Sequence, residues 1–388
     1  MKTPTALTNG TPSAFLTRIF SRRFLANYLS TAVFVGLSYW VVSGLSNFHR
    51  SVLQGQWDLG MFGLEATITT QAVLVTLMAV YALILIPYYA AYPWMRSNAY
   101  TFARGLWFAL RRSRQTPRPA TIRDSMSLPL KLRLSAGARQ SGLTLLLKFF
   151  FAPLMINWCL MHISNMAGSL LQLGDGIQAG HSGRVLFDTS LFWAIFQLIL
   201  FIDTLLFTLG YIVEIPALDN RIRSVDPTFF GWFICLACYP PFNDFTGRFL
   251  EWQSSDFPAF DSSLVHFAVN LSVLAALAIF SWASIALGFK ASNLTNRGIV
   301  TRGPYSHVRH PAYAAKNLAW WLGALPAVIA VSSSGDWKAI AYSLAALSGW
   351  TAIYVLRALT EERHLLMLDN GYAEYMAKVR WRMIPGIW

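Results

Sequence analysis

Long runs of apolar residues alternate with short polar connections along most of this chain. The apolar runs predict membrane-spanning helices at residues 24–46, 66–92, 143–171, 191–218, 229–241, 264–289, 313–331 and 337–359. Most of these runs reach the roughly 20 apolar residues that a helix needs to cross the hydrocarbon core of a bilayer. The pattern therefore predicts an all-α, polytopic integral membrane helix bundle with about eight transmembrane helices.

The run at residues 229–241 is the weakest of the predicted spans, because it is short and ends in Pro240-Pro241. It crosses only if flanking residues extend it. A re-entrant or tilted segment is an equally good interpretation, since irregular backbone is tolerated at membrane depth where protein covers it.

The distribution of charge predicts how the spans are oriented. Residues 94–142 form the longest polar connection and hold ten Lys and Arg residues against one acid, Asp124. Short loops rich in Lys and Arg stay on the cytoplasmic side, so we expect this loop and both termini to be cytoplasmic. Within it, residues 100–110 mix Trp107 and other apolar side chains with arginines, which is typical of a helix lying on the anionic inner leaflet.

Composition excludes most soluble classes of protein. The chain is 55% hydrophobic and only 13% charged, whereas a soluble domain carries nearer a quarter charged residues. The net charge of +13 does not indicate nucleic-acid binding, because the basic residues lie in the loops between apolar runs. We therefore expect membrane lipids as partners, no nucleic acid, and a location in a bacterial inner membrane or an ER-type membrane.

Three charged residues lie inside the predicted spans at 143–171 and 191–218, where a charge is costly and usually faces a partner or a cavity. They are Lys148, Asp203 and Glu214. Asp203 and Glu214 are eleven residues apart, which predicts that they share one face of a helix. A structural pair of Lys148 with Glu214 and a substrate pocket are the two open interpretations.

The cysteines do not predict a metal site. Cys235 and Cys238 have the spacing of a metal-binding pair, but no second pair or nearby histidine follows them. We expect them to be buried thiols, and we expect no metal in this protein.

Candidate chemistry is concentrated at the predicted cytoplasmic ends of the last two spans. Residues 303–313 bring two histidines, two tyrosines and an arginine to a helix entrance at Pro311, where proline is well tolerated. The free N–H groups and positive dipole there favour an anionic group. Arg357 and Glu361 follow on the last span, four residues apart, so they can pair on one helix face.

These motifs resemble, in order and spacing, those of a known enzyme family. The matching positions are Arg309-His310-Pro311-x-Tyr313, an apolar hairpin, Arg357-x-x-x-Glu361-Glu362 and Tyr372-x-x-Tyr375. They are similar to those of the isoprenylcysteine carboxyl methyltransferases, in a superfamily of membrane enzymes that includes phospholipid methyltransferases. The resemblance covers residues 296–388. It divides the chain into N-terminal membrane helices of unrecognised type, residues 1–262, and a catalytic membrane domain with a cytoplasmic C-terminal cap, residues 263–388.

The resemblance implies an S-adenosylmethionine-dependent methyltransferase that acts on a lipophilic or lipidated acceptor. It implies cofactor-binding roles for Tyr305, His310, Tyr313, Glu361, Tyr372 and Tyr375, and catalytic roles for Arg309, Arg357 and Glu362. Either Glu361 or Glu362 would take the cofactor ammonium group, and the two arginines would orient the acceptor. An isoprenylcysteine carboxylate or another small lipidic thiol, carboxylate, amine or phenol remains open as that acceptor.

Two alternatives remain. Residues 379–386 are also similar to the C-terminus of membrane sterol reductases, which share this architecture and use NADPH. Those enzymes typically carry an aspartate at the position of Lys316 and lack a proline after the histidine, so Lys316 and Pro311 together favour the methyltransferase. The second alternative is a non-catalytic membrane scaffold with a degenerate pocket, which would have no need of His310, Arg357 and Glu361.

Overall fold

The structure is a computed structural model that describes residues 19, 21–58, 67–115, 134–368 and 370–388. The chain forms two compact units: unit 1 comprises residues 1–56 and 67–149, and unit 2 comprises residues 57–66 and 150–388. Helices dominate the described residues. Their strands are short, namely β1 (Gln56–Asp58), β2 (Thr67–Thr69), β3 (Ser224–Val225) and β4 (Thr295–Asn296). The all-α class predicted from the apolar runs is confirmed.

Unit 1 is built from helices that begin at polar caps. Its helices are α2 (Arg22–Leu45), α3 (Asn47–Leu53), α4 (Thr70–Ala91), α5 (Asn98–Gln115) and the first part of α7 (Ala136–Gln178). The buried side chain of Asn27 ties α2 to the start of α5, because it donates to the carbonyl of Met95 at 3.0 Å and accepts from the amide of Ser97 at 2.9 Å. Gly105 lets α5 approach α7, since a Cβ there would lie 2.3 Å from that of Ala138.

Helix α5 contains the segment for which a leaflet helix is predicted. The rings of Trp107 and Phe108 are half exposed, and the guanidinium groups of Arg111 and Arg104 lie 5.4 and 5.5 Å from these rings. A helix that exposes aromatic rings and arginines together suits the interface between headgroups and acyl chains. Residues 116–133 of the predicted basic loop lie outside the described residues.

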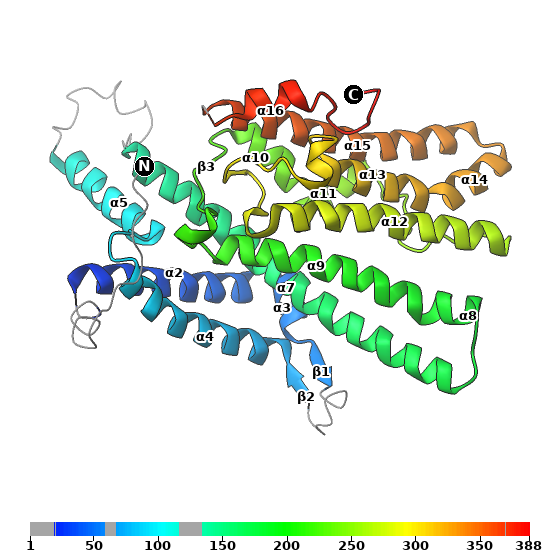
Figure 1. Ribbon diagram of the computed structural model, residues 1–388, viewed down its shortest axis with the longest axis horizontal. Helices are drawn as coiled ribbons and strands as arrows, with labels where there is room; N and C mark the ends of the chain where they lie inside the picture. The colour runs from blue at the N-terminus through cyan, green and yellow to red at the C-terminus, as the bar shows by residue number, and fades with distance from the viewer. Residues whose placement is uncertain (1–18, 20, 59–66, 116–133, 369) are drawn as a thin grey trace, which may run out of the picture. The chain divides into compact units, whose positions relative to one another are not determined.

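Unit 2 contains the remaining elements (Figure 1). After α7 they are α8 (Arg184–Leu186), a π-helical turn η2 (Phe187–Leu191), α9 (Phe192–Ile212), η3 (Pro216–Leu218), β3, α10 (Phe229–Leu236), α11 (Phe242–Phe249), α12 (Ser263–Leu287), η4 (Gly288–Lys290), β4, η5 (Gly303–Ser306), α13 (Pro311–Gly323), α14 (Leu325–Ser334), α15 (Trp337–Leu366) and α16 (Tyr372–Lys378).

Helices α9 and α12 run parallel, as side-chain contacts along them show. His266 bonds to Asp188 at 3.0 Å, Ser284 donates to Asp203, and the amide of Asn293 donates to the Tyr211 hydroxyl. The sequence separation within these pairs stays between 78 and 82 residues. Both helices therefore begin at the same end of unit 2, near Asp188 and His266, and finish near Tyr211 and Asn293. We call the end near Tyr211 and Asn293 the polar end, and the other the opposite end.

Because α9 and α12 are parallel, residues 213–262 must bring the chain back from the polar end to the opposite end. They do so without a long helix, through α10, α11 and an extended stretch. The indole of Trp350 donates to the carbonyl of Leu250 at 2.9 Å, and the amide of Ser255 donates to the carbonyl of Gly323 at 3.0 Å. Asn270 near the start of α12 then donates to the carbonyl of Pro258 at 2.9 Å. Residues 229–241 thus lie in an irregular return path whose backbone is covered by α13 and α15.

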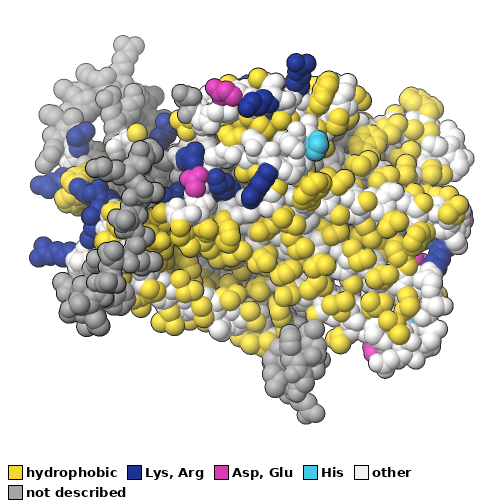
Figure 2. Space-filling view, in the orientation of Figure 1, with side chains coloured by type: hydrophobic (Ala, Val, Ile, Leu, Met, Phe, Trp, Pro, Cys, Tyr) yellow, Lys and Arg dark blue, Asp and Glu magenta, His cyan; other side chains and the backbone are white. Residues whose placement is uncertain are grey.

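Seven helices in the described part of the chain are long and apolar enough to cross a membrane. They are Arg22–Leu45, Thr70–Ala91, Ala136–Gln178, Arg184–Ile212, Ser263–Lys290, Pro311–Ser333 and Trp337–Leu366. On the face drawn in Figure 2, hydrophobic side chains cover the helices of unit 2 and charged ones are few. Large apolar side chains such as Leu264 and Trp337 are 78% and 69% exposed, which suits a surface that faces lipid.

One local prediction from the sequence is wrong. Helix α9 ends at Ile212 and Val213 is extended, so Glu214 lies beyond the helix and does not share a helical face with Asp203. The Glu214 carboxylate instead accepts a hydrogen bond from the amide of Ile222 at 3.4 Å. The pairing of Lys148 with Glu214 stays a prediction.

Gly323 tests the packing of the return path. A Cβ at Gly323 would lie 2.2 Å from the carbonyl oxygen of Ser255, whereas a Cβ at Gly174 in α7 meets open space. We expect Gly323→Ala to destabilise the protein by about 1–3 kcal/mol through overpacking, and Gly174→Ala to be neutral or slightly stabilising. Thermal denaturation of the purified variants in detergent checks this, and equal melting temperatures would contradict it.

The return path also predicts from which side of the membrane a reagent can reach two exposed positions. In a variant without Cys159, Cys235 and Cys238, single cysteines at the exposed positions Asp261 and Ile387 should react with an impermeant maleimide from opposite sides of the membrane. The positive-inside rule assigns Ile387 to the cytoplasmic side. Labelling of both positions from the same side would contradict the path described for residues 213–262.

Candidate functional site

The polar end of unit 2 holds a cavity of about 210 Å³. Eight of the nine residues to which the sequence resemblance gives a role line it: Tyr305, Arg309, His310, Tyr313, Arg357, Glu361, Tyr372 and Tyr375. They come from η5, the entrance of α13, the end of α15 and the cap helix α16. The ninth, Glu362, does not line the cavity and is bound elsewhere.

The entrance of α13 is fixed by backbone hydrogen bonds to the C-terminal segment. Pro311 is the first helical residue and His310 is the N-cap residue. The amides of Arg309 and His310 donate to the carbonyls of Trp381 and Arg382 at 2.9 and 2.8 Å. The His310 side chain makes no capping hydrogen bond, so its imidazole is free to turn toward α15.

Glu362 is the centre of a buried ionic cluster. Its side chain is 5% exposed, and its Oε1 atom accepts from Nε of Arg309 at 2.7 Å and lies 3.3 Å from Nε2 of His310. Its Oε2 atom accepts from Nε of Arg382 at 2.9 Å. Arg309 also donates to the carbonyls of Val379 and Arg380 at 2.9 and 3.0 Å. This cluster binds α15, the entrance of α13 and the C-terminal segment together.

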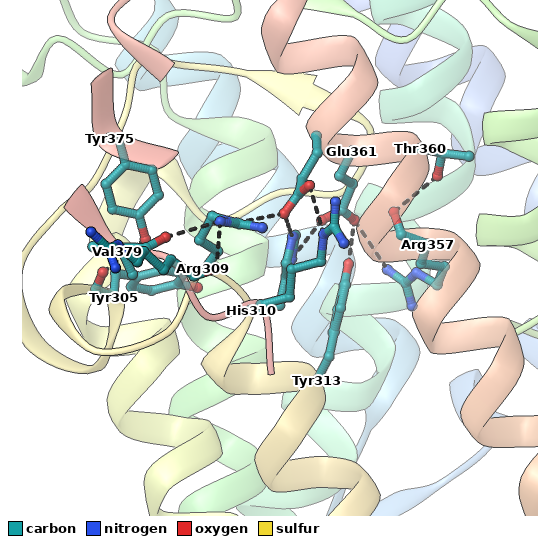
Figure 3. Close-up of polar contacts among 12 residues, drawn as sticks. Tyr305, Arg309, His310, Tyr313, Arg357, Thr360, Glu361, Tyr375 and Val379 are labelled. Carbon is teal, nitrogen blue, oxygen red and sulfur yellow. Dashed lines mark hydrogen bonds and ion pairs between the residues drawn. The ribbon is translucent and has the colours of Figure 1, made fainter. Parts of the chain in front are cut away.

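Glu361, the next residue, faces the cavity instead. Its side chain is 27% exposed, and it accepts a hydrogen bond from the Tyr313 hydroxyl (Figure 3). Nδ1 of His310 and Nη2 of Arg357 lie 3.8 and 3.9 Å from its oxygens, too far for hydrogen bonds. The carboxylate therefore keeps acceptor capacity for a further donor in the cavity. The predicted alignment of Arg357 with Glu361 on one helix face is confirmed in geometry.

Arg357 is buried among aromatic rings. The centres of the Tyr313, Tyr354 and Tyr239 rings lie 4.9, 5.1 and 5.6 Å from its guanidinium carbon. Nη2 donates to Oδ1 of Asn293 at 2.8 Å, while Nε has no hydrogen-bond partner within the described residues. A buried donor without a partner is costly, so this atom marks a place where a ligand group could bind.

The tyrosines of the cap close the cavity on its polar side. The Tyr375 hydroxyl donates to the carbonyl of Tyr305 at 2.7 Å, which attaches α16 to η5. Burial raises the pKa of Tyr375 and of Tyr305 well above the usual range of a phenol. Both phenols therefore stay neutral at physiological pH and are able to donate hydrogen bonds.

The cavity continues inward between apolar walls. Met155, Trp158, Phe207 and Phe280 line this inner part, together with Asp203 from α9, Ser284 from α12 and Lys316 from α13. The sequence singled out Asp203 as costly inside a span and Lys316 as a departure from the sterol reductases. The structure brings them into one chamber, because α9, α12 and α13 pack side by side (Figure 1).

Reasoning from the sequence missed part of the site. Asn293, Arg297, Tyr239 and Tyr354 also line the cavity. Arg297 is buried, donates to Ser292 at 2.8 Å and to the carbonyl of Asn220 at 2.5 Å, and leaves Nη2 without a partner among the described residues. Burial lowers its pKa from the ordinary arginine value. Its position in a basic connection suggested only a role in orienting the membrane spans.

A second cavity of about 450 Å³ adjoins the first. Both are lined by Leu287, Lys290, Ile299 and Val300, so the loop that follows α12 separates them. Lys290 is held by the Asp219 carboxylate at 3.1 Å, and this hydrogen bond lowers the pKa of Asp219. The space available to a ligand at the polar end therefore exceeds the inner cavity alone.

Within the described ranges, no group of three or more His, Cys, Asp or Glu side chains is placed to hold a metal ion. Cys235 and Cys238 are free thiols on and just after α10.

Comparison of the chain with protein-family models, with curated proteins and with solved structures gives no match.

The Glu362 cluster predicts a stability effect that is separate from any ligand. Glu362→Gln leaves the buried Arg309 without its carboxylate, a change that costs about 3–5 kcal/mol for a buried pair. We expect a lower melting temperature and faster tryptic cleavage after Lys378 and Arg380. The exposed Glu374 provides the control, and Glu374→Gln should behave as wild type. An unchanged melting temperature and unchanged proteolysis of Glu362→Gln would contradict the role of the Glu362 cluster in holding the C-terminal segment.

Proposed function

We propose that this protein is a membrane-embedded methyltransferase that uses S-adenosylmethionine and methylates a lipophilic acceptor from the cytoplasmic side. One observation carries the proposal: a single cavity combines a polar half with spare hydrogen-bonding capacity and an apolar half within the helix bundle. This combination suits a zwitterionic cofactor at the polar end and a lipid-soluble acceptor from the membrane.

The polar half fits the amino-acid end of the cofactor. An ammonium group needs acceptors, and Glu361 has capacity left because the Tyr313 hydroxyl is its one hydrogen-bond donor among the described residues. A carboxylate needs donors, and Nη2 of Arg297 lacks a partner among the described residues. His310 stands at the N-terminal, positive end of α13, which also favours an anion. Glu361, His310 and Arg297 would therefore hold this end.

When bound, the cofactor supplies an electrophilic methyl group on a sulfonium. Direct displacement at such a methyl group requires no metal, so the protein contributes alignment and exclusion of water. The cap helix α16 is attached to η5 through the hydrogen bond from Tyr375 to Tyr305 and would exclude water from the polar half. Arg357, whose Nε has no partner among the described residues, lines the cavity and would orient the polar group of the acceptor.

In this proposal the two adjacent glutamates, Glu361 and Glu362, have different roles. Glu361 binds the cofactor ammonium, whereas Glu362 holds the C-terminal segment and acts only through Arg309 and His310. Arg309 donates to Glu362, Val379 and Arg380, so it positions the cap and not the acceptor.

The charge balance favours this cofactor over NADPH, which carries several phosphate charges. Three of the cations lining the cavity already have partners: Arg309 binds Glu362, Lys290 binds Asp219, and Arg357 bonds to Asn293 beside Glu361. Among the described residues, Lys316 lies in the inner part of the cavity with Asp203, which leaves Arg297 to face an anion in the polar half. A polyphosphate ligand would need more free cations than this.

Titration with S-adenosylhomocysteine and, separately, with NADPH tests the proposal. We expect S-adenosylhomocysteine to raise the melting temperature and NADPH to have no effect. Glu361→Gln removes a charge-assisted hydrogen bond and should weaken S-adenosylhomocysteine binding at least about tenfold. Glu374→Gln is the matched control, because Glu374 is exposed and does not line the cavity.

Stabilisation by NADPH alone would replace the proposal with a reductase. A response to neither ligand would favour a scaffold. Equal affinity of wild type and Glu361→Gln for S-adenosylhomocysteine would contradict the assignment of Glu361 but leave the cofactor in place.

A further inference from the structure

The inner half of the cavity contains a lysine whose charge lacks a hydrogen-bond acceptor. Lys316 lies just over one turn into α13 and lines the cavity. The ring centres of Trp320, Phe280 and Tyr354 lie 5.4, 5.6 and 5.9 Å from its Nζ atom, which places the ammonium among aromatic rings. In the part of the chain that the structure describes, Nζ makes no hydrogen bond and no ion pair within 4.0 Å. An ammonium group has three donors, and ring faces satisfy none of them fully.

A carboxylate lines the same chamber but does not reach the lysine. Asp203 on α9 accepts a hydrogen bond from Ser284 on α12, its one hydrogen-bond partner among the described residues. Asp203 and Lys316 interact electrostatically, yet their N and O atoms are more than 4.0 Å apart. Two opposite charges that are held apart in one cavity leave room for a group between them.

The chemistry of the two charged groups determines what fits there. An ammonium only donates hydrogen bonds, and a carboxylate only accepts them. A carboxylate ligand would bind Lys316 but be repelled by Asp203, and an amine ligand would meet the reverse situation. A hydroxyl group satisfies both, because its O–H donates to Asp203 while its oxygen accepts from Lys316.

We infer that Lys316 and Asp203 bind the hydroxyl group of the acceptor, and that this acceptor is a lipophilic phenol. A phenol suits the chamber better than an aliphatic alcohol for two reasons. Its ring can pack against the aromatic walls formed by Trp158, Phe207 and Phe280. Its hydroxyl has a pKa near 10, within reach of a carboxylate base helped by a neighbouring cation.

The methyl transfer itself rests on the proposed function. In that step the O–H bond breaks and its proton passes to the Asp203 carboxylate, while the Lys316 ammonium stabilises the developing oxyanion. The oxygen forms a bond to the methyl carbon, and the electron pair of the broken carbon–sulfur bond stays on sulfur. The products are a methyl ether and a neutral thioether, and the proton leaves Asp203 for water.

Binding of three probes with the same alkyl chain, without cofactor, tests the inference directly. The probes are 4-octylphenol, 4-octylbenzoate and 4-octylbenzylamine, titrated calorimetrically into the purified full chain at one detergent concentration. We expect the phenol to bind wild type at least about tenfold more tightly than the other two. Tighter binding of the benzoate or the amine to wild type would overturn the inference.

Two variants separate this binding from partition into detergent. Lys316→Met should lose about tenfold in phenol affinity and gain affinity for the amine, because the repelling ammonium is gone. Asp203→Asn should also lose phenol affinity and should gain affinity for the benzoate. Phenol affinities within twofold of wild type in both variants would overturn the inference. If a variant does not purify folded, the wild-type order of the three probes decides.

S-Adenosylhomocysteine binding distinguishes this inference from the proposed function. It should be unchanged in Lys316→Met and Asp203→Asn, since neither residue belongs to the polar half. Phenol binding without S-adenosylhomocysteine binding would leave the hydroxyl site standing and remove the methyltransferase. If the protein binds both the phenol and S-adenosylhomocysteine, loss of methyl ether formation in Asp203→Asn supports proton transfer to Asp203. Ether formation at the wild-type rate in that variant overturns this proton transfer.

Discussion

A buried carboxylate holds the polar end of this protein together. Taking a charged group out of water costs several kcal/mol unless cations and hydrogen bonds compensate it. Glu362 receives that compensation from Arg309 and His310 at the entrance of α13 and from Arg382 near the C-terminus. The C-terminal segment therefore supplies part of the positive charge that the buried Glu362 on α15 needs, and it also covers the cavity. Because Glu362 is fully engaged, Glu361 is the one of these two adjacent glutamates that faces the cavity.

A second constraint explains the inner wall of the cavity. Backbone polar groups at membrane depth need partners inside the protein, so a non-helical return path must be covered. Trp350 of α15 and Gly323 of α13 supply hydrogen bonds to this path. Tyr239 lies on the same path and bonds to Asn293 at 3.3 Å, beside Arg357. Helices α13 and α15 thus supply hydrogen bonds to the return path and also contribute the side chains of the site.

The sequence revealed those features that depend on local spacing. Arg357 and Glu361 are four residues apart on one helix, so their alignment needed no knowledge of the fold. The structure departs where a helix ends early, as at Glu214, since apolar composition alone did not locate the end at Ile212. Arg297 was missed because its partners are distant in sequence, and its charge could not be distinguished from one that orients a membrane span.

We propose that the polar half of the cavity binds the amino-acid end of S-adenosylmethionine. An experimental structure of the full chain with S-adenosylhomocysteine tests it most directly. We predict ligand density between η5, α13 and α15, with the ligand ammonium within about 3 Å of a Glu361 oxygen, as a charge-assisted hydrogen bond requires. Density elsewhere, or an ammonium bound by Glu362 with the C-terminal segment displaced, would contradict it.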